Sequence, residues 1–179
     1  LVSGDNLTGT YSGVFNNANV GSGKTVTIIS SYSGADVNNY TITDQSSTTA
    51  DIASKVLTAT ASTANKTYNR STIAATTLTF TGLVGSETLG QTVGSTFDNK
   101  NVGTGKTVTV NSITLADGTG LAANYSISAG QTTTANITAK SLTVSGITAS
   151  NKTYDGNTVS TLDASSVAYS GLVVGDLFT

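Results

Sequence analysis

The segment Asn-Val-Gly-Thr-Gly-Lys-Thr-Val-Thr-Val at residues 101–110 decides the fold. After its lysine, polar and apolar side chains alternate, which places Val108 and Val110 on one face of an extended strand. The two glycines before the strand predict a turn that leads into it. Ile113 and Leu115 fall on the opposite parity, so we expect a bulge or a bend between the two apolar pairs.

The same segment occurs a second time. Residues 19–28 match residues 101–110 at eight of ten positions, at an offset of 82. Four shorter matches follow in order at offsets of 85 to 89: Asn39-Tyr40 with Asn124-Tyr125, Ile52…Lys55 with Ile137…Lys140, Asn65–Tyr68 with Asn151–Tyr154, and Gly82–Val84 with Gly171–Val173. A period of about 85 residues exceeds the roughly 20–50 residues of a solenoid coil, and it is long enough for a small domain.

The period also predicts where the repeats begin and end. It gives the C-terminal part of one repeat, a complete repeat and the N-terminal part of a third, at 1–55, 56–140 and 141–179; in the alternative phase, two whole domains occupy 1–85 and 86–179. Residues 132–144 contain no Gly or Pro, so we expect the last strand of one repeat to run almost directly into the first strand of the next. A junction without a flexible linker favours a stiff, elongated array.

The composition predicts an all-β chain. It contains 35 Thr and 23 Ser, and its apolar residues are largely Val, Ile, Leu and Ala. β-Branched side chains fit a pleated sheet and lose rotamer freedom in helices. Short alternating runs are separated by Gly, Asn and Asp clusters, and no stretch has a convincing amphipathic helical period. We therefore expect tandem antiparallel β-sandwich units, Ig-like in shape, with a β-grasp-like unit as the alternative.

Charge and residue content exclude several function classes. A net charge of −2 and a pI of about 4.7 disfavour nucleic-acid binding, which needs a basic stripe. No apolar run is long enough to predict membrane insertion. Without His or Cys, the common nucleophile–base pairs and soft-metal sites cannot be built. We expect no enzyme activity, and we assign no catalytic, cofactor-binding or metal-binding residue.

Two motifs resemble ligand sites. The Val-Gly-x-Gly-Lys-Thr segments are similar to a phosphate-binding loop, but Ala18 and Lys100 stand where that motif needs its first glycine, and strand sequence follows instead of a helix. We interpret them as turns. Tyr154-Asp155-Gly156-Asn157 suggests a Ca²⁺ loop, although one carboxylate is few for such a site. A turn with Gly at positive φ is the simpler interpretation, with Tyr68 and Tyr154 packed inward.

The sequence also contains residues suited to two chemical modifications. Lys24 and Lys106 recur at matched positions, as do Asn39 and Asn124, so a Lys–Asn crosslink is an alternative to surface lysines and turn asparagines. Sequons for glycosylation stand at seven positions, which composition alone could produce: Asn6, Asn39, Asn65, Asn69, Asn124, Asn136 and Asn151.

The ordered motifs resemble a known repeat family. Lys152-Thr153-Tyr154-Asp155-Gly156-Asn157-Thr158, the later Gly171-Leu172-Val173, and residues 100–108 with Asn124-Tyr125 look like the YDG-type repeats of large bacterial surface adhesins of the filamentous-haemagglutinin-like secreted class. The middle repeat departs from the pattern, with Tyr68-Asn69-Arg70 in place of Tyr-Asp-Gly. The resemblance implies an extracellular repeat array on the bacterial cell surface, and it supplies no catalytic residues.

These observations lead to two expected functions. The first is a structural stalk or spacer of a surface adhesin or fibre, and the alternative is an adhesive module whose repeats bind glycans or self-associate into filaments. The expected partners are neighbouring repeats of the same chain. Homotypic head-to-tail association is the further possibility, in which residues 141–179 of one molecule pair with residues 1–55 of the next.

Overall fold

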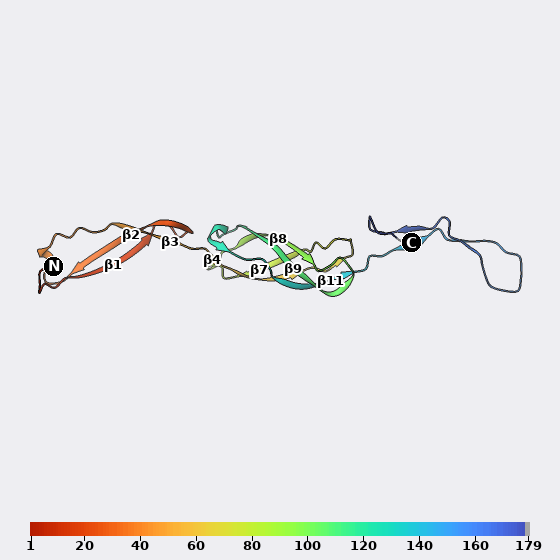
Figure 1. Ribbon diagram of the computed structural model, residues 1–179, viewed down its shortest axis with the longest axis horizontal. Helices are drawn as coiled ribbons and strands as arrows, with labels where there is room; N and C mark the ends of the chain where they lie inside the picture. The colour runs from red at the N-terminus through yellow and green to blue at the C-terminus, as the bar shows by residue number, and fades with distance from the viewer. Residues whose placement is uncertain (178–179) are drawn as a thin grey trace. The chain divides into compact units, whose positions relative to one another are not determined.

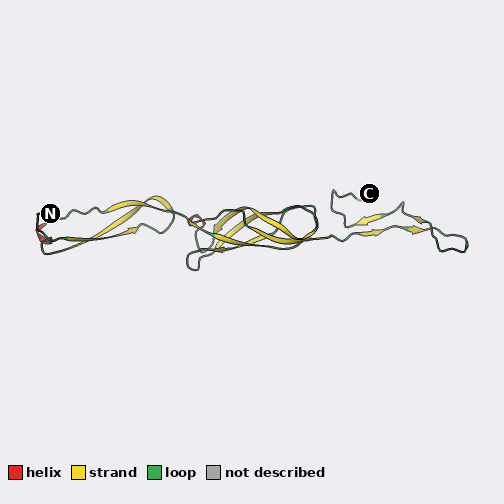
Figure 2. Ribbon diagram, turned by 60° about the horizontal axis from the view of Figure 1, so that its bottom comes forward, coloured by secondary structure: helices red, strands yellow, loops and turns green. Residues whose placement is uncertain are grey.

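The computed structural model describes residues 1–177, and these residues form an all-β structure, as the sequence predicted. Figure 2 shows strands and loops along nearly the whole chain. Two short 3-10 turns, η1 (Val37–Asn39) and η2 (Ala122–Asn124), are the helical elements of this described part. Neither they nor any other described segment is a helix long and apolar enough to cross a membrane.

The first sheet has three antiparallel strands, which Figure 1 draws in red and orange. They are β1 (Thr8–Phe15), β2 (Gly21–Ser33) and β3 (Ser47–Ile52), in the order β1-β2-β3. The long β1–β2 ladder pairs Thr8 with Ser33 at one end and Phe15 with Val26 at the other. In this order β1 and β3 are the edge strands of the sheet.

A second sheet repeats this arrangement and adds one strand. Its order is β6-β11-β9-β8, where β8 is Leu89–Phe97, β9 is Gly103–Asp117, β11 is Thr132–Thr138 and β6 is Lys66–Thr67. Two-stranded sheets account for the other strands: β4 (Lys55–Val56) with β10 (Tyr125–Ser126), β5 (Thr58–Thr63) with β7 (Thr76–Thr81), β12 (Thr143–Ser145) with β15 (Ala168–Ser170), and β13 (Thr148–Ala149) with β14 (Leu162–Asp163). The pairs β4–β10 and β6–β11 are parallel, a feature that side-chain periodicity cannot reveal.

The two sheets share their register as well as their order. In each, the ladder shifts at the Gly-x-Gly-Lys segment, where four residues of one strand oppose three of its neighbour. The matched pairs are Gly21↔Ile52 and Lys24↔Ala50 in the first sheet, and Gly103↔Ile137 and Lys106↔Ala135 in the second. The sequence repeat is therefore also a structural repeat, down to the position of the bulge.

The described chain forms two compact units, each assembled from separate segments. Unit 1 contains Leu1–Thr58, Phe80–Thr92 and Thr114–Ser128. Unit 2 contains Ala59–Thr79, Val93–Ile113 and the chain from Ala129 onward. The repeat boundaries inferred from the sequence describe its period. As boundaries of structural domains, they remain a prediction.

The core of unit 2 lies on the inner face of the second sheet. Its buried residues form one cluster with Tyr68 packed against it: Ala74, Phe97, Val108, Ala135 and Ile137. Val110 is also buried, which confirms that Val108 and Val110 share a face. Farther along β9, Asn111 and Ser112 are both exposed, so the inward parity changes there as the sequence predicted, within one continuous strand.

The segment 141–177 contains only short strand pairs, and its apolar side chains are poorly covered. Leu142 and Val144 are 37% and 48% exposed, although they alternate as expected for a strand. The near-continuous strand expected over residues 132–144 is interrupted, because β11 ends at Thr138 and β12 begins at Thr143.

A pair of isoleucine substitutions tests this description of the core. Ile137 is 1% exposed and Ile73 is 72% exposed. We expect Ile137→Ala to lower the free energy of unfolding by about 2–5 kcal/mol, because it leaves a cavity under the sheet. Ile73→Ala should change it by less than about 0.5 kcal/mol. Chemical denaturation of the two variants measures both values, and equal losses would contradict the assigned core.

Candidate functional site

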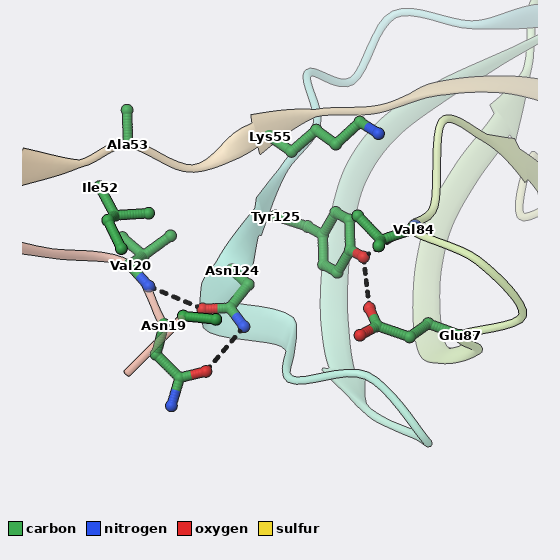
Figure 3. A pocket seen from close by; sticks show the side chains of 10 residues that line it. Asn19, Val20, Ile52, Ala53, Lys55, Val84, Glu87, Asn124 and Tyr125 are labelled. Carbon is green, nitrogen blue, oxygen red and sulfur yellow. Dashed lines mark hydrogen bonds between the residues drawn. The ribbon is translucent and has the colours of Figure 1, made fainter. Parts of the chain in front are cut away.

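Unit 1 contains a crevice of about 310 Å³, which Figure 3 shows from close by. Residues that match across the repeats form much of its wall. The lining residues are Ala18, Asn19, Val20, Ile52, Ala53, Lys55, Val84, Glu87, Asn124 and Tyr125. The lining thus combines apolar side chains with those of asparagine, lysine and glutamate.

Asn124 connects two segments that are far apart in the sequence. Its side-chain oxygen accepts a hydrogen bond from the backbone N–H of Val20 at 2.9 Å, and its amide nitrogen donates to the Asn19 side chain at 3.1 Å. The turn η2 ends at Asn124, and the next residue, Tyr125, pairs in parallel with Lys55. The amide of Asn124 is consequently used in structural contacts within the crevice.

Tyr125 is fixed by two hydrogen bonds on its hydroxyl. The group accepts the backbone N–H of Val84 at 3.0 Å and donates to the Glu87 carboxylate. The ring is 6% exposed. The hydrogen bond to Glu87 is the main cause that raises the pKa of Tyr125 above its ordinary value, and burial adds to it. The phenol therefore stays protonated and acts as a structural donor.

The same arrangement is present one repeat earlier. The hydroxyl of Tyr40 accepts the backbone N–H of Val2 at 2.7 Å and donates to the Asp5 carboxylate. Because both tyrosines follow the recurring asparagine, this Tyr–acid bond is a property of the repeat. The bond holds the loop that carries the acid against the end of the 3-10 turn.

Comparison of the repeats aligns Asp5 with Asp176, but the acid of the middle repeat and the bond to tyrosine were missed at the level of sequence. Asp5, Glu87 and Asp176 occupy one position of the repeat, and the change from Asp to Glu in the middle copy conceals it. The signal that could have revealed it is the constant distance of three residues from the valine of the preceding Leu-Val pair. In unit 2, Asp176 accepts the Tyr68 hydroxyl at 3.2 Å and lies 3.6 Å from the Arg70 guanidinium.

The Gly-x-Gly-Lys segments form β-bulges and do not cradle phosphate. The N–H of Gly23 donates to Asp51 at 2.7 Å, and the N–H of Gly105 donates to Asn136 at 2.8 Å. Both glycines have positive φ, 59° and 60°, a conformation that is strained for other residues. A strand follows each segment, so the helix N-terminus required for phosphate binding is missing.

The lysines of these segments bind inside their own hairpins. Lys24 donates to Asn17 at 2.6 Å, and Lys106 donates to Asn99 at 2.8 Å. Lys106 also pairs with Asp98 at 2.8 Å, and this hydrogen bond holds the pKa of Asp98 below its usual range.

The matched lysines and asparagines suggested a Lys–Asn crosslink, and the observed partners of the lysines argue against it. The structure joins Lys24 and Lys106 to Asn17 and Asn99, whereas the proposed partners Asn39 and Asn124 make other hydrogen bonds. An ionised acid such as Asp98 also cannot lend a proton to the amide. The structure therefore does not assemble the crosslinking group that the sequence suggested.

The Tyr-Asp-Gly segment is a turn, as predicted. Gly156 has φ 75°, and the residue at the same position in the middle repeat is Arg70, with φ 65°. The Asp155 carboxylate accepts the N–H of Asn157 at 3.1 Å and the Lys152 ammonium at 2.8 Å. The carboxylate that would hold Ca²⁺ thus has a lysine partner, and no cluster of three metal-ligating side chains occurs in residues 1–177.

The two tyrosines of this motif differ in environment. Tyr68 packs on the core of unit 2, as expected. Tyr154 is 94% exposed, so the expectation that it packs inward is wrong for this copy. The physical reason is that segment 141–177 contains no counterpart of the sheet under Tyr68.

Several sequon asparagines have structural roles. The side-chain oxygens of Asn65, Asn69, Asn124 and Asn136 each accept a hydrogen bond from a backbone N–H. Glycosylation remains a prediction at all seven sequons. The assignment of no catalytic, cofactor or metal residue also remains a prediction.

Tyr125→Phe tests the importance of the Tyr–acid bond. The change leaves the Val84 N–H and the Glu87 carboxylate without their partner, and we expect the thermal midpoint of unfolding to fall by several degrees. Tyr154→Phe is the matched control, because that tyrosine is 94% exposed, and it should leave the midpoint unchanged. Calorimetry of both variants measures the two midpoints. An unchanged midpoint for Tyr125→Phe would contradict the structural role of the Tyr–acid bond.

Comparison with known proteins gives one match. A family model described as YDG domain matches residues 1–50 and 53–135, well over half of the chain. No curated protein and no solved structure matches.

Proposed function

Because the chain belongs to the YDG domain family, we propose that it is an extracellular structural repeat, a stalk or spacer of a large bacterial surface adhesin or fibre. The observation that carries this proposal is the hydrogen-bonded junction in unit 1. There, Asn124 of the middle repeat binds Asn19 and Val20 of the preceding one. A spacer needs such contacts, because successive repeats must stay connected by more than a single strand of chain.

The backbone at this junction supports the same role. β3 ends at Ile52 and β4 begins at Lys55, so only two residues separate them. β4 then pairs with β10, and the N–H of Leu57 donates to the carbonyl of Ser126 at 2.8 Å. Short connections and paired backbone leave little slack in the chain.

The tyrosines favour a spacer over a sugar-binding module. Tyr40, Tyr68 and Tyr125 donate their hydroxyls to the recurring acids. Tyr40 and Tyr68 are half-buried and Tyr125 is buried, so these rings, held by their hydroxyls, offer little free face to a sugar.

A glycan-binding module is the second candidate, and one exposed ring favours it. Tyr11 is 67% exposed and stands edge-on to Tyr32, with ring centroids 6.0 Å apart. It lines a shallow crevice with hydroxyl side chains, among them Thr10 and Ser30. An exposed aromatic face beside hydroxyls is a suitable surface for a saccharide.

Stretching the chain between its two ends tests the spacer role. We expect residues 56–140 to resist extension and then unfold in a discrete step. The length released is the extended length of the segment, roughly 290 Å at about 3.4 Å per residue, minus the distance that the folded repeat already spans. Single-molecule force spectroscopy measures this step. Smooth extension without a discrete event would count against a load-bearing repeat.

A glycan array separates the two candidates. If the chain is a spacer, it should be retained on no glycan above the level of its Tyr11→Ala variant. Tyr11 lies on the exposed side of β1, so the variant should keep its fold, which circular dichroism checks. Saturable binding that disappears in Tyr11→Ala would establish the glycan-binding module instead.

A further inference from the structure

Two parallel strand pairs join the beginning of the middle repeat to its end. In unit 1, β4 pairs in parallel with β10, with Lys55 opposite Tyr125. In unit 2, β6 pairs in parallel with β11, with Lys66 opposite Ile137. β4 and β6 belong to the N-terminal part of the repeat, and β10 and β11 belong to its C-terminal part. Each unit thus connects an early strand directly to a late one.

Parallel pairing determines how these bonds are loaded when the chain is stretched. Tension pulls the early strand of each pair from its N-terminal side and the late strand from its C-terminal side. In a parallel pair, these two pulls are directed along the strands and oppose each other. The hydrogen bonds across the pair are therefore loaded together, in shear. In an antiparallel hairpin pulled at its open end, the bonds would instead break one after another.

Backbone and side-chain bonds cross the pair β4–β10. The N–H of Leu57 donates to the carbonyl of Ser126 at 2.8 Å. The hydroxyl of Ser54 donates to the hydroxyl of Ser126 at 3.3 Å. These bonds join the two strands of unit 1 over the whole length of the short ladder.

The pair β6–β11 is crossed by bonds of three kinds. The N–H of Tyr68 donates to the carbonyl of Thr138 at 2.8 Å, and the hydroxyl of Thr138 donates to the carbonyl of Lys66 at 3.4 Å. Just before both strands, the N–H of Asn136 donates to the side-chain oxygen of Asn65 at 2.7 Å. Residues 65–68 are therefore tied to residues 136–138 at successive points.

Buried side chains shield both pairs from water. Leu57, Tyr125 and Ile137 are 3%, 6% and 1% exposed. A hydrogen bond in such surroundings is electrostatically stronger than one in water. We consequently expect the bonds of both pairs to open slowly under load.

We propose that the parallel pairs β4–β10 and β6–β11 form a mechanical clamp, which resists tension along the chain and yields to tension across the strands. The clamp consists of residues 54–57 with 125–126 in unit 1, and of residues 65–68 with 136–138 in unit 2. Load bearing as a biological task rests on the proposed spacer role. The clamp itself is a property of the fold, and it can be tested whether or not the chain is a spacer.

The test pulls the same strand pair in two directions. The chain contains no cysteine, so two cysteines introduced into the full chain define where the handles of a force probe attach. Ala64→Cys with Lys140→Cys loads β6–β11 in shear, because the handles lie on opposite ends of the pair. Ala64→Cys with Thr134→Cys pulls both strands from their N-terminal side and peels them apart. All three side chains are exposed, so both proteins should keep the fold.

The same comparison is made for β4–β10 with handles at other exposed positions. Ala53→Cys with Ser128→Cys gives shear, and Ala53→Cys with Ala123→Cys gives peeling. Forced unfolding follows the rate of crossing the unfolding barrier, and we expect the first step to need at least about twice the force in shear, since several bonds must break together. Thermal denaturation of the proteins should give equal midpoints, so that the difference in force reports the direction of the pull.

Two asparagine variants separate the clamp from ordinary stability. In each, the lost group is a side-chain oxygen that accepts a backbone N–H. For Asn65 this N–H belongs to Asn136 across the pair, whereas for Asn69 it belongs to Ser71 in the same loop. With handles at positions 64 and 140, Asn65→Ala should lower the unfolding force by roughly a third, because it removes one of the three bonds named above between these segments. Asn69→Ala should leave the force unchanged.

Two results would overturn the clamp. One is an equal unfolding force in the two directions of pull. The other is an Asn69→Ala protein that loses as much force as Asn65→Ala. Either result would leave the spacer role standing, whereas glycan binding that depends on Tyr11 would overturn the spacer role and leave the clamp standing.

Discussion

The antiparallel ladder between β9 and β11, with its fixed bulge, is the constraint on which the rest of the repeat depends. The bulge forms because Gly105 adopts positive φ and donates its N–H to Asn136. With the register set there, Val108 and Ile137 both face inward and are almost completely buried. Side chains alternate along a strand, so a slip of one residue would expose both. The equivalent bulge in the first sheet fixes Val26 in the same way.

The sequence predicted those features that side-chain alternation and local turn chemistry encode. The all-β class, the shared face of Val108 and Val110, the change of parity in β9 and the glycine turn at Gly156 all belong to this group. Alternation reports which side of a strand is buried, and it carries no information about which strand lies next to it. The parallel pair β6–β11 was invisible for that reason.

The Tyr–acid bonds show a second limit of prediction from sequence. Comparison of the repeats position by position detects identical residues, but a carboxylate acceptor for a phenol can come from Asp or from Glu. Glu87 therefore did not stand out as the equivalent of Asp5 and Asp176, although the tyrosines did stand out. The exposure of Tyr154 could not be predicted either, because the same Asn-Lys-Thr precedes Tyr154 and Tyr68, and the local sequence does not show whether a sheet lies beneath the ring.

The junction around Asn124 has a consequence for how such an array changes in length. Its partners Asn19 and Val20 stand at positions that recur in the next period as Asn101 and Val102. Every full period thus encodes both halves of the contact. Duplication or deletion of one whole period in the gene would leave each junction with matching halves.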